Sequence, residues 1–264
     1  MKRIFAIALA LVMVLSLAAC AGNSNTTGSQ TPATSTVAPS TSAPTTTVPV
    51  TPPEVEVMTY EEYMAAEIDS EVIIEAYVQA HQAWWSNKIT VYAQDPDGAY
   101  FIYEMACSEE DAAKLTAGTK IRVTGVKGEW EGEVEIMDAT FKFVEAEPWV
   151  AEAEDVTALL GTDDLIKHQN KFVCFKGLTI ESISYKNNEP GDDIYVNVSF
   201  NGTTYSFCVE VYLTGTDTDV YKAFAELKAG DVVDIEGFLY WYNGANTHIT
   251  SVTKVNVAGG GVVI

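Results

Sequence analysis

Leu115-Thr-Ala-Gly-Thr-Lys-Ile-Arg-Val-Thr-Gly125 is one of two copies of the stretch from which the fold of this chain can be predicted. The second copy, Leu227-Lys-Ala-Gly-Asp-Val-Val-Asp-Ile-Glu-Gly237, aligns with the first without a gap at an offset of 112 residues. In each copy a helix end is followed by a glycine turn and then by alternating apolar residues that run to another glycine. Alternation predicts a strand with one buried face, and an interior glycine indicates a bend or a close backbone approach. We therefore expect a module of one helix and one sharply curved strand, used twice.

The same order of elements is expected around each copy. Around the first copy, apolar alternation predicts strands over residues 71–78, 89–93, 99–105, 120–127 and 133–143. Capping patterns that begin at Thr59 and Ser108 predict short helices, at 60–66 and in the stretch that ends at Leu115. Around the second copy, strands are expected over residues 172–184, 194–200, 203–213, 231–240 and 248–257. A weak helix is expected over 162–169, a loop over 185–193 and a longer helix over 217–227.

Five short strands with a helix between the third and fourth make up the order of the OB-fold, a small and partly open barrel. The repeated Leu-x-x-Gly-x-x-Val-x-Val-x-Gly pattern is similar to the fourth strand of that fold, and residues 58–145 and 155–257 both resemble bacterial OB-fold domains with a leading helix. The resemblance implies a mainly β chain with two tandem five-stranded OB-like barrels, each with short helices. It assigns no functional residue, because this fold serves many functions.

The N-terminus has the composition of a targeting segment. Lys2 and Arg3 precede an apolar run over residues 4–17, which is shorter than the roughly 20 residues of a membrane-spanning helix. Leu17-Ala-Ala-Cys20 follows and resembles the bacterial lipobox, in which the cysteine is acylated and becomes the new N-terminus. The resemblance implies a lipoprotein signal peptide over residues 1–20 and acyl chains, such as palmitate, on Cys20. We expect this lipid to hold the chain on the extracytoplasmic face of the cell membrane.

Composition divides the rest of the chain. Residues 21–53 are rich in Ser, Thr, Ala and Pro and contain no charged residue, which predicts a disordered linker. The OB-like domains are expected over residues 54–148 and 149–258, with a short tail over 259–264. Pro148-Trp149, at the boundary, is interpreted as a hinge or a docking wedge.

The charge balance is strongly acidic, with 37 Asp and Glu against 15 Lys and Arg and a net charge of −22 at pH 7. A field of this sign repels polyphosphate, whose affinity for proteins comes mainly from Lys and Arg. Nucleic acid is therefore expected to be an unlikely partner. The acidity fits solubility at a cell surface or recruitment of cations and basic partners. The expected partners are the membrane, through Cys20, and a glycan or an envelope protein.

No catalytic or cofactor motif stands out. His81, His168 and His248 are scattered over the two units, and none lies beside a paired acid or a cysteine. The sequence has no His-Glu-x-x-His, Gly-x-Ser-x-Gly, P-loop or dinucleotide pattern. Acidic clusters such as Asp95-x-Asp97-Gly98 are interpreted as turn chemistry rather than calcium ligands. We expect a non-catalytic protein without a cofactor or metal ion.

Three cysteines remain after Cys20, an odd and sparse count that is not typical of a disulfide framework. Cys174 and Cys208 fall in apolar strands and are interpreted as small buried residues, with a bridge between them left open. Cys107 has no evident partner in the sequence.

Aromatic residues at loop tips are the best candidates for a binding site. OB-folds bind ligands over strands 2 and 3, between the 1–2 and 4–5 loops, and aromatic faces there stack on sugars, bases or apolar patches. Such rings can instead plug barrel ends or pack two units together. In extended chain Trp84 and Trp85 point to opposite sides, so one of them is expected to meet solvent or a partner. The candidates are Trp84, Trp85, Trp130, Tyr185, Trp241 and Tyr242.

Three hypotheses follow for function. The first is a non-catalytic, surface-anchored lipoprotein that binds an extracellular glycan or protein through loop aromatics. The second is a structural or accessory protein that docks onto another envelope protein through the Pro148-Trp149 region. The third, by fold analogy, is extracellular binding of single-stranded nucleic acid or a nuclease accessory role.

Overall fold

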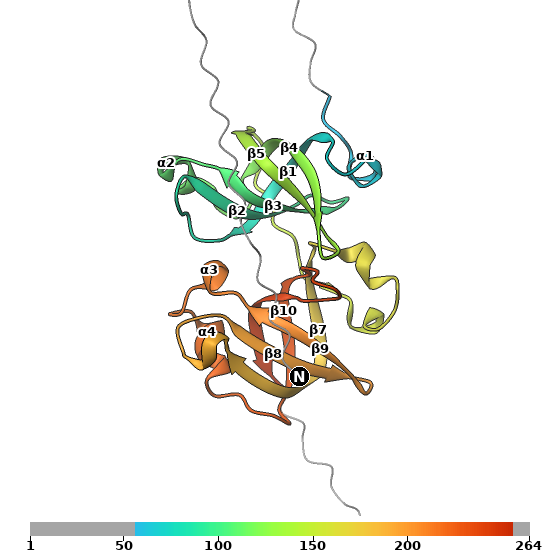
Figure 1. Ribbon diagram of the computed structural model, residues 1–264, viewed down its shortest axis with the longest axis vertical. Helices are drawn as coiled ribbons and strands as arrows, with labels where there is room; N and C mark the ends of the chain where they lie inside the picture. Colours follow the sequence, from blue (N-terminus) through green and yellow to red (C-terminus); the bar gives the residue numbers. More distant parts are fainter. Residues whose placement is uncertain (1–55, 256–264) are drawn as a thin grey trace, which may run out of the picture. The chain divides into compact units, whose positions relative to one another are not determined.

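The computed structural model describes residues 56–255, which belong to one compact unit (Figure 1). The expected signal peptide, Cys20, the linker over 21–53 and the tail over 259–264 lie outside the described residues. Within the described part, no helix combines the length and apolar character needed to cross a membrane. The described chain is mainly β and forms a closed barrel and a second sheet.

The first sheet is a closed five-stranded barrel. Its elements are α1 (Tyr60–Ala65), β1 (Glu71–His81), β2 (Lys88–Gln94), β3 (Ala99–Ala106), α2 (Glu109–Ala112), β4 (Lys120–Trp130) and β5 (Glu133–Phe143). The strands pair in the order β1-β2-β3-β5-β4, β4 closes onto β1, and β3 runs parallel to β5. With α2 between β3 and β4, this is the order of the OB-fold, which confirms the expectation for the first unit.

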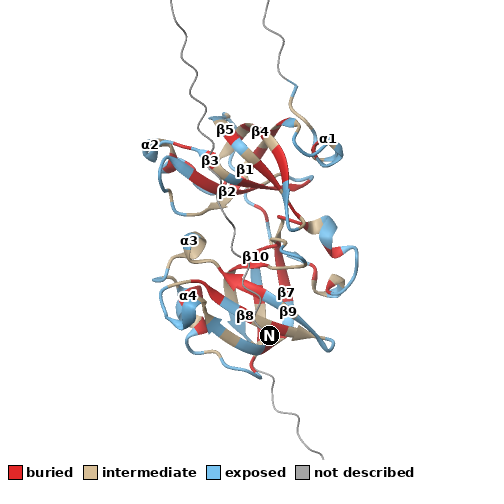
Figure 2. Cartoon of the chain, viewed as in Figure 1, coloured by how far each residue is buried: buried red, intermediate tan, exposed pale blue. Residues whose placement is uncertain are grey.

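Alternation along β1 and β4 builds the core of the barrel. Val72, Ile74, Ile121 and Val123 are fully buried, whereas their neighbours in sequence are partly exposed, so inward and outward residues alternate along both strands (Figure 2). The alternation continues through Gly125, where the β4–β5 register slips. A Cβ at Gly125 would lie 2.6 Å from Ile136 Cγ2. The repeated glycine therefore allows a bulge and a close strand approach, as the sequence predicts.

Helix α1 packs against the barrel through one buried lysine. The capping box predicted at Thr59 is present, and Tyr63 of the helix lies in the barrel core. Lys127 on β4 donates from Nζ to the carbonyl oxygens of Tyr63, Met64 and Ala66, at 3.0, 2.7 and 2.8 Å. These carbonyls lie at the end of the helix, where backbone acceptors run short of partners, so the lysine helps to satisfy them and fixes α1.

The second sheet repeats the strand order of the first. Its elements are β6 (Glu154–Asp155), β7 (Phe172–Tyr185), β8 (Ile194–Phe200), β9 (Thr203–Val209), α3 (Val211–Thr214), α4 (Asp219–Phe224), β10 (Val232–Phe238) and β11 (His248–Lys254), with 3₁₀ turns at Thr157–Leu159, Leu165–His168 and Lys186–Asn188. The order is β10-β11-β9-β8-β7-β6, and β10 also pairs with β7. Gly237 marks a register shift between β10 and β11, at the position that Gly125 occupies between β4 and β5.

Three expected elements of the second unit differ in the structure. The strand expected over 203–213 ends at Val209, because the Glu210 carboxylate accepts hydrogen bonds from the amides of Tyr212 and Leu213 and starts α3. The helix expected over 217–227 is confined to α4. The weak helix expected over 162–169 is a single 3₁₀ turn.

The barrel and the second sheet share a buried aromatic contact. The rings of Tyr92 on β2 and Phe238 on β10 stack with centroids 4.6 Å apart, and Phe101 on β3 packs beside them. Tyr92 Oη also lies 2.6 Å from His248 Nδ1 in a buried hydrogen bond. Part of the β2–β3 surface, where a ligand was expected, is therefore covered by the second sheet.

Pro148-Trp149 is docked onto the first barrel. The Trp149 ring lies 5.6 Å from that of Tyr77, and its amide donates to the carbonyl oxygen of Gly118 at 3.3 Å. Two residues later, the Ala151 amide donates to Gln79 Oε1 at 2.8 Å. Of the two interpretations of this dipeptide, the contacts favour a docked wedge over a hinge.

Candidate functional site

The adjacent tryptophans separate as the sequence predicts. Trp84 packs against the barrel core, and its Nε1 donates to the carbonyl oxygen of Cys107 at 2.9 Å. Trp85 is 75% exposed. An indole with so little burial contributes little to the core, which makes Trp85 a candidate contact for a ligand.

A tight turn holds Trp85 in place. Its amide and carbonyl both pair with those of Lys88, at 3.0 Å each, which closes a two-residue hairpin. Ser86 and Asn87, the residues of that turn, have φ of 52° and 63°, as a type I′ turn requires. The indole therefore stands on a short, closed turn rather than on a long loop.

Trp85 lines a cleft of about 410 Å³ on the β1–β2 loop and on strands β2 and β3. Two further exposed rings line the same cleft: Tyr103 of β3 and Tyr212 of α3. A Lys88–Glu104 ion pair of 2.7 Å lies among them. The lining residues are Gln82, Ala83, Trp85, Lys88, Ile89, Thr90, Tyr103, Glu104 and Tyr212. We call this hollow the aromatic cleft.

Sequence reasoning missed two rings of the cleft: Tyr103, which lies on an expected strand and not at a loop tip, and Tyr212. The stretch around Tyr212 was assigned to a strand, so nothing placed it at a loop tip near Trp85. In the structure the Tyr212 carbonyl oxygen accepts the Ala83 amide at 2.7 Å, which ties α3 to the β1–β2 loop. The signal available in the sequence was Glu210 as a helix cap, followed by Gly215 as a helix end.

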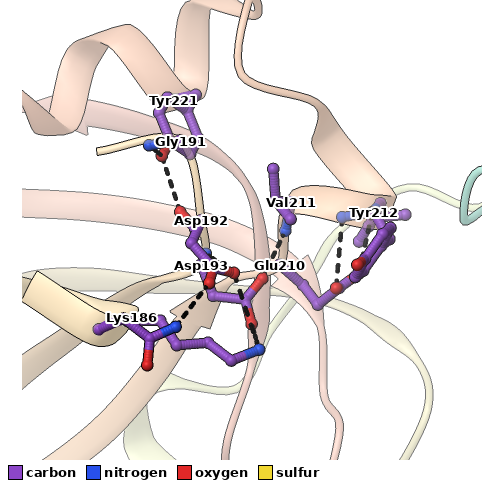
Figure 3. A network of polar contacts seen from close by, with 10 residues as sticks. Lys186, Gly191, Asp192, Asp193, Glu210, Val211, Tyr212 and Tyr221 are labelled. Atoms are coloured by element: carbon purple, nitrogen blue, oxygen red, sulfur yellow. Dashed lines mark hydrogen bonds and ion pairs between the residues drawn. The ribbon is translucent and has the colours of Figure 1, made fainter. Parts of the chain in front are cut away.

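A polar network fixes α3 and so positions Tyr212 (Figure 3). Asp193 accepts from the Val211 amide at 3.0 Å and from Lys186 Nζ at 2.8 Å. The Glu210 carboxylate caps the same helix, and burial, together with the nearby Asp193 charge, raises the pKa of Glu210 to about 7. Together these bonds occupy the amides of the first three residues of α3, Val211, Tyr212 and Leu213.

Trp241 and Tyr242 lie apart from this cleft, in a groove of about 730 Å³ on the second sheet. Tyr195 of β8 and Tyr205 of β9 line it too. Tyr242 and Tyr195 are 50% and 40% exposed, whereas Trp241 packs partly against the core. The structure therefore brings these two predicted residues together, but in a groove separate from the one that Trp85 lines.

The two remaining candidates line neither hollow. Trp130 is 58% exposed at the end of β4, and Tyr185 packs against the core of the second sheet, 6.4 Å from the ring of Tyr221. Tyr185 is therefore a packing residue, which was the structural alternative to ligand binding for these rings. Trp130 is an exposed aromatic residue close in sequence to the contact between the sheets.

Buried polar groups hold the start of β5 against the second sheet. Gln169 donates from Nε2 to the Gly132 carbonyl at 2.8 Å and accepts the Val134 amide at 3.0 Å. Glu133 Oε2 accepts the Trp241 amide at 2.8 Å. Burial raises the pKa of Glu133 to about 8, and burial lowers the pKa of His248 to about 4. Both groups are therefore held mainly in their neutral forms at pH 7.

The described residues offer little for covalent or metal chemistry. Cys107, Cys174 and Cys208 are buried free thiols, and burial raises the pKa of each. A buried thiol with a raised pKa is a poor nucleophile. Between residues 56 and 255, no group of three or more His, Cys, Asp or Glu side chains has the spacing to hold a metal ion. Asp95 accepts from the amides of Asp97 and Gly98, which confirms its turn role.

The strand order and the aromatic cleft together define an OB-type barrel with a candidate ligand surface. No protein-family model matches the chain, and no curated protein does either.

Among solved structures, the chain is similar to the Ifi202 HINa domain in complex with 20-bp dsDNA, with 11% identity, 70% of this chain and 98% of that chain covered, and a TM-score of 0.32. The p204 HINb domain is 12% identical over 69% of this chain and 95% of that chain, with a TM-score of 0.32. A replication protein A heterotrimer bound to ssDNA is 11% identical over 69% of this chain and 49% of that chain, with a TM-score of 0.28.

One expectation about partners is corrected by these matches. From the acidic charge alone, nucleic acid is expected to be an unlikely partner. Two of the similar structures are DNA complexes, which contradicts that expectation. Net charge describes the whole surface, whereas binding depends on the groups at one site, so nucleic acid is retained among the ligands to be tested.

Proposed function

We propose that the chain is a non-catalytic, membrane-anchored binding protein that holds an extracellular ligand with ring-shaped units in the aromatic cleft. One observation carries the proposal: Trp85, Tyr103 and Tyr212 are 75%, 44% and 62% exposed around a single hollow. The hollow lies on the β1–β2 loop and strands β2 and β3, the region where OB-type barrels hold oligosaccharides and oligonucleotides.

The cost of keeping three large rings in water supports a binding role. Exposed apolar groups that gather in one place indicate a surface that another molecule covers. Tyr and Trp suit such a surface because each offers a flat apolar face and a polar edge, and neither loses much conformational entropy on binding. Turn bonds at Trp85 and cap bonds at α3 hold these residues before the ligand arrives, which favours affinity.

A glycan is the first candidate ligand. Lys88 and Glu104, the two charged residues of the cleft, already form an ion pair with each other. Their charges cancel, so the lining presents no net charge to a ligand. Gln82 and Thr90 add an amide and a hydroxyl to the lining. Stacking surfaces beside neutral hydrogen-bonding groups match a sugar, which has an apolar ring face and a rim of hydroxyls.

Single-stranded nucleic acid is the second candidate. Bases also stack on aromatic side chains, and base stacking tolerates any sequence because every base has a flat face. Lys88 supplies one cation at the cleft. Salt separates the candidates, because oligonucleotide affinity falls steeply as salt rises while binding of a neutral sugar does not.

The anchor and the second barrel complete the proposal. Leu17-Ala-Ala-Cys20 supports lipidation of Cys20 at the extracytoplasmic face of the membrane, with residues 21–53 as a tether between the lipid and the folded part. The β10–β7 pairing supports a second OB-type barrel in tandem with the first. The two together present the aromatic cleft outside the cell.

The test is a binding screen with matched variants. The full-length protein is screened on a glycan array and against single-stranded oligonucleotides at low and high salt. Trp85→Ala is expected to abolish the signal, whereas Trp130→Ala, which removes an exposed indole outside the cleft, is expected to retain it. Equal binding by the two variants would refute the cleft as the site.

A further inference from the structure

A second hollow adjoins the aromatic cleft. Its volume is about 530 Å³, and it is lined by Ala83, Tyr212, Val211 and part of the loop between β7 and β8 (residues 186–192). Ala83 and Tyr212 also line the aromatic cleft. Because the hollows share these two residues, they meet at Ala83 and Tyr212, and we call the two together the groove. We call the second part the polar hollow.

The polar hollow has walls that are fixed to each other (Figure 3). One wall is the 186–192 loop and the other is α3. Asp193 joins them, because it binds Lys186 of the loop at 2.8 Å and the Val211 amide of α3 at 3.0 Å. Tyr221 Oη donates to the Asp192 carbonyl at 2.7 Å and accepts the Gly191 amide at 2.9 Å. The walls are therefore organised before any ligand binds, as an affinity site requires.

The chemistry of the polar hollow differs from that of the aromatic cleft. Tyr212 is the single aromatic residue of its lining. Asn187 donates from Nδ2 to Asp192 Oδ2 at 3.1 Å, and Lys186 is engaged by Asp193. Glu189 is exposed at the rim. The lining thus offers amide and carboxylate groups, with its lysine already neutralised, which suits hydroxyl groups better than an anion.

The geometry points to a linear, neutral oligosaccharide that occupies both parts of the groove. One sugar stacks in the aromatic cleft, the chain crosses Tyr212, and a following sugar hydrogen-bonds in the polar hollow. This inference rests on the proposed function and adds to it a minimum ligand length and a second contact surface. Joining two subsites in one ligand raises affinity, because the second contact is made without a further loss of overall motion.

The test compares ligand length with hollow-specific variants. Calorimetry with the full-length protein uses several series of neutral linear oligosaccharides, and each series runs from the monosaccharide to the hexasaccharide. The wild type is expected to gain roughly tenfold in affinity once the ligand reaches both subsites. The double variant Asn187→Gly, Glu189→Ala is expected to lose that gain and to bind the shortest ligand as the wild type does. Glycine keeps the left-handed φ of 59° at position 187, so the loop is preserved.

The outcomes separate this inference from the proposed function. Affinity that does not rise with length, or a gain that the double variant retains, overturns the extended groove. If Trp85→Ala still abolishes binding in that case, the proposed function stands. Failure of every saccharide to bind, or retention on single-stranded oligonucleotides alone, overturns the oligosaccharide and the extended groove together.

Discussion

The Asn243 amide donates to the carbonyl oxygen of Glu131 at 2.8 Å, and Asn243 Nδ2 donates to Glu131 Oε2 at 2.8 Å. The two residues are 112 positions apart, the offset between the copies of the repeated stretch, so they occupy equivalent places in the two units. The two copies of the repeat are therefore in contact, because the turn after β4 binds the turn after β10. Both turn residues have positive φ, 51° and 54°, and each is followed by a glycine.

This contact helps to hold the two sheets as one body. Around it lie the Tyr92–Phe238 stack and the Gln169 bonds to the start of β5. The aromatic cleft takes Trp85 and Tyr103 from one unit and Tyr212 from the other, so its shape depends on this arrangement.

The buried carboxyl of Glu133 is expected to make the stability of the protein depend on pH. Burial raises its pKa from 4.5 to about 8, so folding favours the protonated form. Its contribution to stability is complete below the unfolded-state pKa and is lost as pH rises through about 8. In Glu133→Gln the neutral amide can still accept the Trp241 amide. The variant is expected to be more stable than wild type at about pH 9, by a few times the roughly 1.4 kcal/mol of one pKa unit.

Urea unfolding at several pH values measures this effect. Exposed Glu129→Gln serves as the control and is expected to follow the wild type. A Glu133→Gln variant whose stability falls with rising pH as steeply as that of the wild type would show that this carboxyl is not the source.

Any side chain at the bulge glycine Gly125 is expected to destabilise the protein. A Cβ there would lie 2.6 Å from Ile136 Cγ2 and 2.8 Å from the Met137 carbonyl oxygen, a backbone atom that moves only with its strand. Gly125→Ala should lower the free energy of unfolding by about 1–3 kcal/mol. Gly230→Ala meets no atom within 4 Å and strains only its φ of 87°, so a loss of about 1 kcal/mol is expected. Equal losses in urea unfolding would contradict the close strand approach.

The buried hydroxyl of Tyr92 is expected to stabilise the contact between the sheets. Tyr92→Phe keeps the ring stacked on Phe238 but leaves His248 Nδ1 without its partner in a buried site. The expected loss is about 1–3 kcal/mol. Thermal unfolding measures it, with the exposed Tyr195→Phe as the control. An unchanged melting temperature for Tyr92→Phe would mean that another group replaces the hydroxyl.

Cys20 is expected to determine membrane association. Cys20→Ser removes the thiol that would be acylated, so the protein should move from the membrane fraction to the soluble fraction while its circular dichroism spectrum stays that of a β protein. Cell fractionation checks this. Membrane association that survives in Cys20→Ser would rule out the lipid as the anchor.

The first barrel was predictable because its signals are local. Alternation at Val72 to Ile74 and at Ile121 to Val123, with glycine at position 125, indicates strands and a bend without knowledge of distant contacts. Strand β5 was predicted with the bounds that the structure has, Glu133–Phe143. The packing of Trp84 on the core and the exposure of Trp85 agree with the alternation of an extended chain.

The candidate site was only partly predictable, because it joins residues far apart in the sequence. Trp85 and Tyr212 are 127 positions apart and meet through packing of one unit on the other, which no local pattern encodes. The apolar run that ends at Leu213 has the alternation of a strand, and the cap at Glu210 prevails over that pattern. Tyr92 and Phe101 lie on the surface expected to bind ligand, yet the second sheet covers them.

Calorimetric titration of Tyr212→Ala tests the central claim most directly, because Tyr212 lines both parts of the groove and comes from the unit opposite Trp85. With the best ligand from the array, Tyr212→Ala is expected to lose at least about tenfold in affinity, while Trp130→Ala binds as the wild type does. Wild-type affinity in Tyr212→Ala would contradict the account, because the ligand would then have to bind elsewhere on the protein.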